Sequence, residues 1–285
     1  MSCHIDDIIV LYKIQRFLGK GQVYSNKSKY IAEYRLSGAH NCLVYLVPIL
    51  IDFPLLTSKR YDFIKFVNII YLYLSLTNKV LNGVLLEHVK SVLLTINSHN
   101  KNVVNMPTSI NPFWLLGFVE AEGTFGIIGL IPYFQVAQHV KSQEVLLAIK
   151  KFLLDMTNTY LPGIVNVSTF VNKRTDVIKL VISGKSDLYF ITTNIFINIP
   201  FQTRKIEDFL YWSVILLMFK YKLVNDIESR QFVQQVKNYI NKKRYSNARV
   251  KPIRPIISVN ILNQISTECY ETPNTIQVKN NVKTI

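Results

Sequence analysis

The spacing of apolar residues predicts two amphipathic helices that repeat one another along the chain. The segments DDIIVLYKIQRFLGKGQVY and KSQEVLLAIKKFLL each place four apolar residues at helical spacing, and every residue of the second set follows its counterpart by 135 positions. The matched residues are Val10, Leu11, Ile14 and Phe17 in the first segment and Val145, Leu146, Ile149 and Phe152 in the second. A constant offset of this kind indicates an internally duplicated fold.

Each predicted helix is followed by the pattern of a β-hairpin. The segments QVYSNKSKYIAEYRL and GIVNVSTFVNKRTDVIKLVIS have strand character around a polar, turn-like centre. Their tips, residues 26–29 and 172–175, are polar and basic, as expected of strands whose free side meets phosphate. The candidate nucleic-acid contacts at these tips are Lys27, Lys29, Lys173 and Arg174.

A third repeated segment follows each hairpin, since PLLTSKRYDF matches PFQTRKIEDF at an offset of 146. The shared residues are Pro54, Thr57, Lys59, Asp62 and Phe63 in the first copy and Pro200, Thr203, Lys205, Asp208 and Phe209 in the second. Long apolar helical stretches follow both copies, so the whole order of elements occurs twice.

This order predicts how the chain divides into units. We expect a first unit over residues 1–98, an Asn- and Ser-rich linker over 99–111 and a second unit over 112–247. Residues 248–285 read as a basic and polar tail that we expect to be poorly ordered. The basic part of this tail is either simply solvated or an arm that grips phosphate.

The segment NPFWLLGFVEAEGTF reads as a helix built for close packing. Asn111 can cap this helix and Pro112 suits its first turn. Apolar residues then cover every face, so we expect the helix to be buried on all sides. Gly117 in its interior costs about 1 kcal/mol relative to alanine, which indicates close approach of a second helix, and Gly123 is placed to end the helix as a C-cap.

Two acidic residues, Glu120 and Glu122, lie in the last turn of this predicted helix, where the helix dipole disfavours negative charge. We therefore expect a cation nearby to offset them. Residues two apart do not share a helix face, so the two carboxylates should have different roles. Glu122, at the open end, is better placed to hold a hard divalent ion such as Mg²⁺. The alternative is an ordinary buried helix whose acids are exposed or paired with lysines.

The charge balance of the chain points to a polyanionic partner. Its 285 residues include 33 lysines and arginines against 18 acidic residues, a formal charge of +15, and nucleic acid would relieve the self-repulsion. An anionic membrane surface is the rival, because mean hydropathy is +0.19. The apolar stretch over residues 209–219 is nevertheless too short for a bilayer, which needs about 20 residues, so we expect no membrane insertion.

The remaining compositional signals concern the compartment. Cys3, Cys42 and Cys269 share no metal-like spacing and make an odd count, which suggests reduced, structural thiols. Lys, Asn, Ile and Tyr are abundant while Gly, Pro and Trp are few, a bias that AT-rich coding sequence produces and that hints at an organelle.

The segment LLGFVEAEG, residues 115–123, closely resembles the nine-residue signature of the LAGLIDADG family of homing endonucleases and intron maturases. The resemblance covers residues 1–247. It implies an α+β fold of two pseudo-symmetric αββαββα units with antiparallel β-saddles, in which two motif helices pack along a pseudo-twofold axis. It also implies an organelle-encoded protein of the mitochondrion.

The resemblance assigns roles to particular side chains. The family's catalytic positions correspond here to Glu122, Gln138, Lys59 and Lys205. The helix interface corresponds to Gly117, Glu120 and Gly123. Among these, Glu122 is the expected ligand of Mg²⁺ or another divalent metal, Glu120 is a structural acid, and the lysines neutralise charge near the cleaved phosphates.

The first copy departs from this pattern because it has no motif helix. The counterpart of Phe134, 135 positions earlier, would precede Met1, and Cys3 falls where the second copy has Gln138. We predict an intron-encoded endonuclease that makes metal-dependent double-strand breaks at a long DNA target, as a pseudo-twofold monomer if an upstream motif is supplied. One motif carboxylate alone should not cut both strands. The alternatives are an RNA maturase that binds group I intron RNA and a basic membrane-associated protein.

Overall fold

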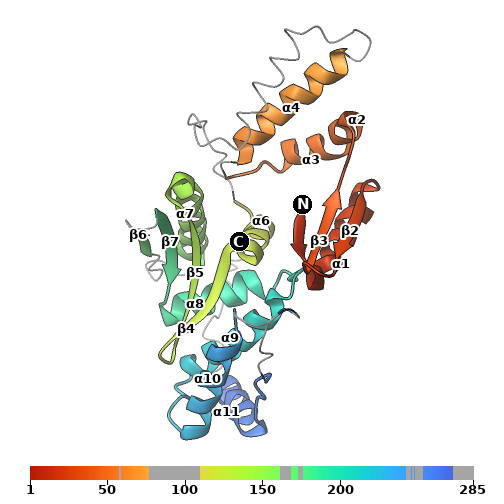
Figure 1. The fold of residues 1–285 in the computed structure, drawn as a ribbon. Coiled ribbons are helices and arrows are strands. Elements are labelled where there is room, and N and C mark those ends of the chain that lie inside the picture. The colour runs from red at the N-terminus through yellow and green to blue at the C-terminus, as the bar shows by residue number, and fades with distance from the viewer. Residues whose placement is uncertain are drawn as a thin grey trace, which may run out of the picture.

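Figure 1 shows two antiparallel sheets, each with its own helices, which lie on either side of helix α6 in this view. The computed structural model describes residues 1–57, 59–76, 110–160, 168–172, 176–241, 245, 247 and 253–271. The arrangement is the α+β fold of two related units that the sequence predicts.

The first unit holds the predicted helix and hairpin. Its elements are β1 (Ser2–His4), η1 (Ile5–Asp7), α1 (Ile8–Leu18), β2 (Gln22–Asn26), β3 (Ile31–Arg35), α2 (Ala39–Asn41), η2 (Cys42–Leu46), α3 (Val47–Asp52) and α4 (Lys59–Leu76). The strands form a sheet in the order β1-β3-β2, with β2 and β3 joined as the expected hairpin.

The second unit repeats these elements and adds a helix and a strand in front of them. Its elements are α6 (Pro112–Glu122), β4 (Gly123–Ile128), β5 (Ile131–His139), η3 (Val140–Ser142), α7 (Gln143–Tyr160), β6 (Ser168–Asn172), β7 (Val177–Ile182), α8 (Lys185–Ile191), η4 (Thr192–Phe196), α9 (Lys205–Lys220), α10 (Ile227–Tyr239) and α11 (Val259–Glu271). Its sheet has the order β4-β5-β7-β6, in which β5 and β7 occupy the places of β1 and β3.

The repeat extends to individual hydrogen bonds. His4 and His139 each end a strand, and the Nδ1 atom of each accepts a bond from the backbone N–H two residues on, at 3.2 and 3.1 Å. Likewise Thr57 and Thr203 each accept a bond on Oγ1 from the backbone N–H two residues on, both at 3.3 Å. These matched caps confirm that the offsets seen in the sequence mark equivalent positions.

The hairpin backbone is also duplicated. Tyr30 and Asp176, at equivalent positions, both have positive φ angles, 55° and 49°. The carbonyl oxygen of each accepts a hydrogen bond from the backbone N–H of the first residue of a 3-10 turn. The donors are Ile5 of η1, at 2.9 Å, and Val140 of η3, at 2.7 Å. A left-handed conformation at two non-glycine residues is uncommon, so its repetition reflects a shared architecture.

The two units differ in the size of their cores. The buried core of the second unit is large and centres on aromatic side chains such as Phe125, Phe134 and Trp212. In the first unit the buried cluster between α1 and the sheet consists of Leu11, Ala32 and Tyr34. Phe17, the counterpart of the half-buried Phe152, is 77% exposed. The first unit therefore leaves apolar surface open where the second unit covers it.

The C-terminal region corrects one expectation. Residues 259–271 form α11, and Ile261 and Ile265 from this helix pack into the core of the second unit. The prediction of a poorly ordered tail is therefore wrong for residues 253–271, because apolar residues at an i, i+4 spacing give that segment a buried helical face. Most of the linker, residues 99–109, and the tip residues Lys173 and Arg174 lie outside the described residues. Within the described part of the chain, no helix is long and apolar enough to cross a membrane.

Candidate active site

The motif helix α6 begins as its sequence predicts. The Asn111 side chain accepts a hydrogen bond from the backbone N–H of Trp114 at 2.8 Å, and Pro112 occupies the first turn. One face of the helix is fully buried through Leu115 and Val119. This face fixes α6 against β4 and β5.

The opposite face of α6 is open, so the expectation of a helix buried on all sides is wrong. Phe113 is 73% exposed, and Gly117, one turn further on, is exposed with no atom within 4 Å of where a Cβ would stand. Trp114 and Phe118 are half-buried and stack on one another with ring centroids 4.9 Å apart. The close helix contact predicted at Gly117 is not made by any described residue, because no described element covers that face.

Gly123 ends the helix, but by a different route from the one expected. Its φ of −76° and ψ of 154° are extended rather than left-handed, and β4 starts at this residue. A Cβ here would stand 2.7 Å from the carbonyl oxygen of Val119. Glycine is therefore needed because the chain turns directly from helix into strand with no room for a side chain.

Glu120 binds the loop that leads into α9. Its Oε1 atom accepts hydrogen bonds from the backbone N–H of Gln202 at 2.7 Å, from the backbone N–H of Thr203 at 2.6 Å and from Thr203 Oγ1 at 3.0 Å. These donors precede the N-terminus of α9, where the helix dipole favours negative charge. Glu120 thus has a structural partner that offsets its place at the end of α6.

Lys205 supplies the cation that the end of α6 requires. Lys205 is 4% exposed, and its Nζ atom donates a hydrogen bond to the carbonyl oxygen of Gly123. Lys205 therefore contacts the end of α6 at Gly123, the residue after Glu122, and its ammonium group is buried.

Glu122 is the last residue of α6 and is exposed. Among the described residues it makes no hydrogen bond or ion pair, and those residues contain no cluster of three or more His, Cys, Asp or Glu side chains. A single free carboxylate fits a site for a hard divalent ion that completes its shell with water and substrate phosphate, which is how Mg²⁺ is commonly held. It does not make a metal cage by itself.

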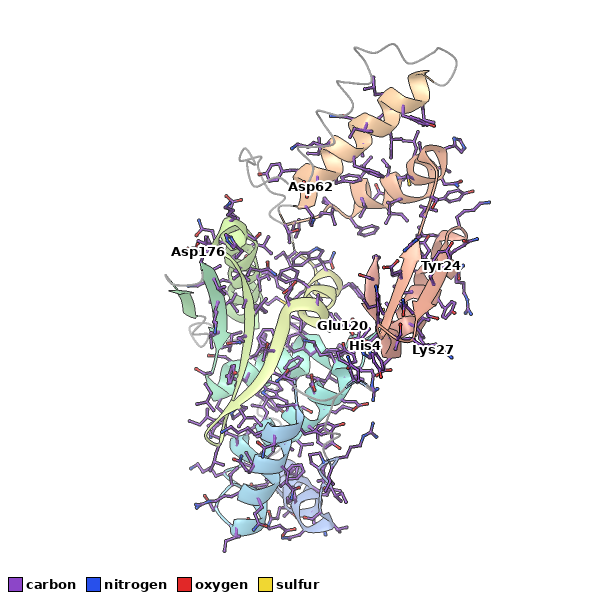
Figure 2. The ribbon with its side chains drawn as sticks, viewed as in Figure 1. His4, Tyr24, Lys27, Asp62, Glu120 and Asp176 are labelled. Carbon is purple, nitrogen blue, oxygen red and sulfur yellow. The ribbon has the colours of Figure 1, made fainter. Side chains whose placement is uncertain are left out.

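Lys59 lies away from this end of the helix. Its Nζ atom pairs with Asp62 Oδ2 at 3.6 Å, and its side chain is exposed. The preceding loop packs at the start of α6, where Pro54 and Leu56 line a cavity of about 430 Å³ with Phe113. Figure 2 shows Asp62 apart from Glu120.

The length of α6 decides whether Lys59 shares a site with Glu122. A helix of 11 residues is about 16 Å long, and the loop before Lys59 packs at its opposite end. The structure therefore unites Lys205, but not Lys59, with the end of α6. Gln138, the remaining candidate, is half-buried in β5 opposite Ile178, and no bond joins it to Glu122 among the described residues.

Both sheets present a face away from their cores. In the first unit this face carries Tyr24, Glu33 and Arg35, with the guanidinium of Arg35 5.2 Å from the ring centre of Tyr24. Lys27 and Lys29 are exposed at the hairpin tip, and Figure 2 shows Lys27 and Tyr24 on this outer hairpin. Strand faces of this kind suit a polyanionic surface.

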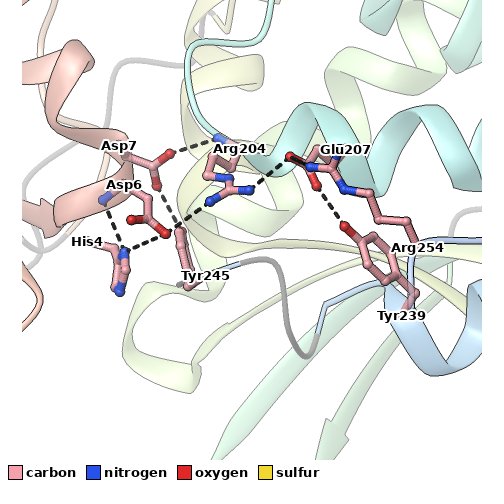
Figure 3. A network of polar contacts seen from close by, with 8 residues as sticks. All are labelled: His4, Asp6, Asp7, Arg204, Glu207, Tyr239, Tyr245 and Arg254. Carbon is pink, nitrogen blue, oxygen red and sulfur yellow. Dashed lines mark hydrogen bonds and ion pairs between the residues drawn. The ribbon is translucent and has the colours of Figure 1, made fainter. Parts of the chain in front are cut away.

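The sequence did not reveal a polar network that joins the two units. Asp6 and Asp7 of the first unit contact Arg204 of the second, and Arg204 continues to Glu207 (Figure 3). The available signal was a departure from the repeat: Asp7 stands where the second copy has Ser142.

Comparison with known sequences finds relatives over most of the chain. Residues 1–70 match the model of the LAGLIDADG endonuclease family. An uncharacterized mitochondrial protein, RF1, of Saccharomyces cerevisiae is 28% identical over 95% of this chain and 59% of its own length. A probable intron-encoded endonuclease, Cox1-I1b, of Schizosaccharomyces pombe is 26% identical over 80% of this chain and 58% of its own length. The chain therefore spans less than two thirds of the length of these two relatives.

Solved structures share the fold. The meganuclease I-SmaMI bound to uncleaveable DNA superposes with a TM-score of 0.71 and 19% identity over 85% of this chain and 86% of its own. The LAGLIDADG homing endonuclease I-LtrWI bound to target DNA gives 0.69 and 18% over 85% of each chain. In its N-terminal sequence and in its two-unit fold, this chain is therefore similar to LAGLIDADG endonucleases.

Proposed function

We propose that this chain acts in metal-dependent hydrolysis of DNA phosphodiester bonds at a long, specific site, as an intron-encoded homing endonuclease. The observation that carries the proposal is the end of α6, where Glu122 is exposed without a bond to any described residue and the buried ammonium of Lys205 contacts the carbonyl of the next residue, Gly123. Three further features support it: the net charge of +15, the open sheet faces and relatives that are named endonucleases.

The side chains at the end of α6 have separable tasks. Glu122 is the residue that would hold a divalent metal, which supplies an activated water and stabilises the leaving oxygen when it is bound. Mg²⁺ is the metal we propose, and a related meganuclease was crystallised on its DNA in the presence of calcium ions. Lys205 places positive charge at the C-terminal end of α6, and Glu120 holds the loop that leads into Lys205.

Double-stranded DNA is the partner that the open surfaces fit best. A two-stranded ribbon enters the major groove, and the β2–β3 hairpin carries Lys27 and Lys29 at its tip. In the second unit, Lys173 and Arg174 would do the same. Lys59 and Gln138 stay as proposed active-site residues, and for Lys59 this would require the first unit's loop to approach Glu122.

The open face of α6 limits what this chain can do alone. No described residue covers the face of α6 that carries Phe113 and Gly117, and the sequence contains one motif acid. Cutting both strands would need a second carboxylate, and a second motif helix packed on this face would supply it and complete a pseudo-twofold monomer. Without such a helix we expect nicking of one strand.

A cleavage assay tests the proposal. The purified chain selects duplexes from a randomised pool, and the selected duplexes are then incubated on a plasmid with Mg²⁺. We expect nicking or cleavage that Glu122→Gln abolishes and that Glu144→Gln, an exposed acid at the start of α7, leaves unchanged. Cutting by Glu122→Gln at the wild-type rate would rule out Glu122 as the metal ligand, and failure to select any duplex would rule out a DNA function.

The same variant separates nuclease from maturase. A maturase would bind folded group I intron RNA by its basic surface and would support splicing after Glu122→Gln. The mitochondrial relative and the compositional bias agree on a mitochondrial setting for either activity.

A further inference from the structure

The loop between η4 and α9, residues 200–204, is held from two sides. From the second unit, Glu120 accepts bonds from the backbone of Gln202 and Thr203. From the first unit, Asp7 Oδ1 accepts a bond from the backbone N–H of Arg204 at 2.8 Å. The loop that leads into Lys205 is thus clamped between α6 and a residue nearly 200 positions earlier in the sequence.

Asp7 is buried and fully occupied. It is 5% exposed, and its second oxygen accepts a hydrogen bond from the hydroxyl of Tyr245 at 3.0 Å. A buried carboxylate is costly unless its oxygens are bonded, so Asp7 strongly favours the arrangement in which Arg204 stays in place. His4 stacks on Tyr245, the residue that donates to Asp7, with ring centroids 4.2 Å apart.

Side chains reinforce the contact on either side of Asp7. Arg204 bonds Asp6 at 3.0 Å and Glu207 at 3.1 Å, and Glu207 continues to Arg254 at 3.1 Å (Figure 3). Lys13 of α1 donates to Gln202 Oε1 at 2.8 Å. These contacts of the first unit therefore converge on one loop of the second unit.

The acid of the clamp is not part of the sequence repeat. Ser142, at the position equivalent to Asp7, is also buried but cannot supply a charge. The fold of a single unit therefore does not need an acid at this position. The acid is present only where the first unit meets the loop that carries Lys205.

We propose that Asp7 is a positioning residue for the site at the end of α6: by holding the Arg204 amide, it fixes Lys205 and Glu120 relative to Glu122. The inference rests on the proposed nuclease function. It adds that docking of the first unit controls the geometry of the second unit's active site, so the two halves of the protein are coupled through this loop.

The test compares Asp7→Ala with Asp226→Ala in the full chain. Asp226 is a matched control, because it also accepts a bond from a backbone N–H at a helix start, that of Ser229 at 2.8 Å, but lies away from the loop. Two quantities are measured for each variant: hydrogen exchange of the backbone amides in residues 200–205, and the single-turnover cleavage rate on selected duplexes with Mg²⁺ alongside their dissociation constant.

We expect Asp7→Ala to raise exchange in the loop and lower the cleavage rate, each by about tenfold or more, with a change in duplex affinity of less than about threefold. Asp226→Ala should change none of these. Hydrogen exchange in the loop should rise less in Arg204→Ala than in Asp7→Ala, because Arg204→Ala keeps the backbone N–H that donates to Asp7.

Two results would overturn the inference: equal loop exchange in Asp7→Ala and Asp226→Ala, or loss of cleavage in Asp7→Ala without any change in loop exchange. If the wild-type chain cleaves nothing, the proposed function fails separately. The positioning role is then decided by loop exchange alone, since that measurement needs no substrate.

Discussion

A single carboxylate oxygen, Glu120 Oε1, accepts two hydrogen bonds from Thr203, one from its backbone N–H at 2.6 Å and one from its hydroxyl at 3.0 Å. The two residues are 83 positions apart. Their contact joins the end of α6 to the start of α9. It explains how an acid can occupy the last turn of a helix, where the dipole opposes negative charge.

This contact predicts a graded loss of stability at position 120. Glu120→Ala removes the acceptor of three hydrogen bonds and should lower the free energy of unfolding by about 1–3 kcal/mol. Glu120→Gln keeps one carbonyl oxygen for the same donors and should cost less. Urea unfolding followed by tryptophan fluorescence measures both, with Glu144→Ala as an exposed control. Equal free energies of unfolding for the alanine variant and the wild type would show that the contact does not stabilise the fold.

The two glycines at the motif helix predict opposite effects of alanine. Gly123→Ala places a Cβ 2.7 Å from the Val119 carbonyl oxygen, so we expect a loss of stability. Gly117→Ala adds a methyl group in open space on an exposed helix face and should stabilise this chain by up to about 1 kcal/mol.

Thermal unfolding of the two glycine variants beside the wild type measures both effects. A destabilised Gly117→Ala would mean that another surface, such as a second copy of the chain, covers that face of α6 in solution. That explanation can be checked by repeating the measurement at several protein concentrations, because an association would make the effect concentration-dependent.

The sequence predicted the features that depend on neighbouring residues. The amphipathic helix over α1, the β2–β3 hairpin and the Asn111 cap follow from local spacing and local hydrogen bonds, and each is present. The repeat added the equivalence of Thr57 and Thr203, because a duplicated turn requires the same cap twice.

The features that were missed depend on how distant segments dock. The composition of α6 shows that it is apolar all round, but not which face a neighbour covers, so the exposure of Gly117 was not foreseeable. The separation of Lys59 from Glu122 is set by the docking of the first unit's loop at the start of α6. The Asp7–Arg204 contact joins residues far apart in the sequence, and the repeat does not predict it because Ser142 stands at the position equivalent to Asp7.

A pH prediction follows from the cap of α10. The backbone N–H and then the hydroxyl of Ser229 donate to Asp226 and hold the pKa of its carboxyl below the ordinary value of 3.8. A lowered folded-state pKa means that this contribution to stability is present above the unfolded-state pKa and is lost as the pH falls through the folded-state pKa. The stability gap between wild type and Asp226→Asn should therefore be constant near neutral pH and shrink in acid. Urea titrations over that range measure it, and a gap that widens in acid would contradict the assignment.

The hairpin tip of the first unit makes a prediction about salt. Lys27 and Lys29 are exposed, and phosphate contacts by lysine release counterions from duplex DNA. Replacing one of them by alanine should weaken binding of all duplexes alike and reduce the slope of log affinity against log salt by about one. Lys185, whose ammonium lies 4.8 Å from the ring centre of Phe219, is a control because it is committed to a contact within the second unit. Fluorescence anisotropy at several salt concentrations gives the slopes, and an unchanged slope for both tip variants would mean that the β2–β3 tip does not touch the phosphate backbone.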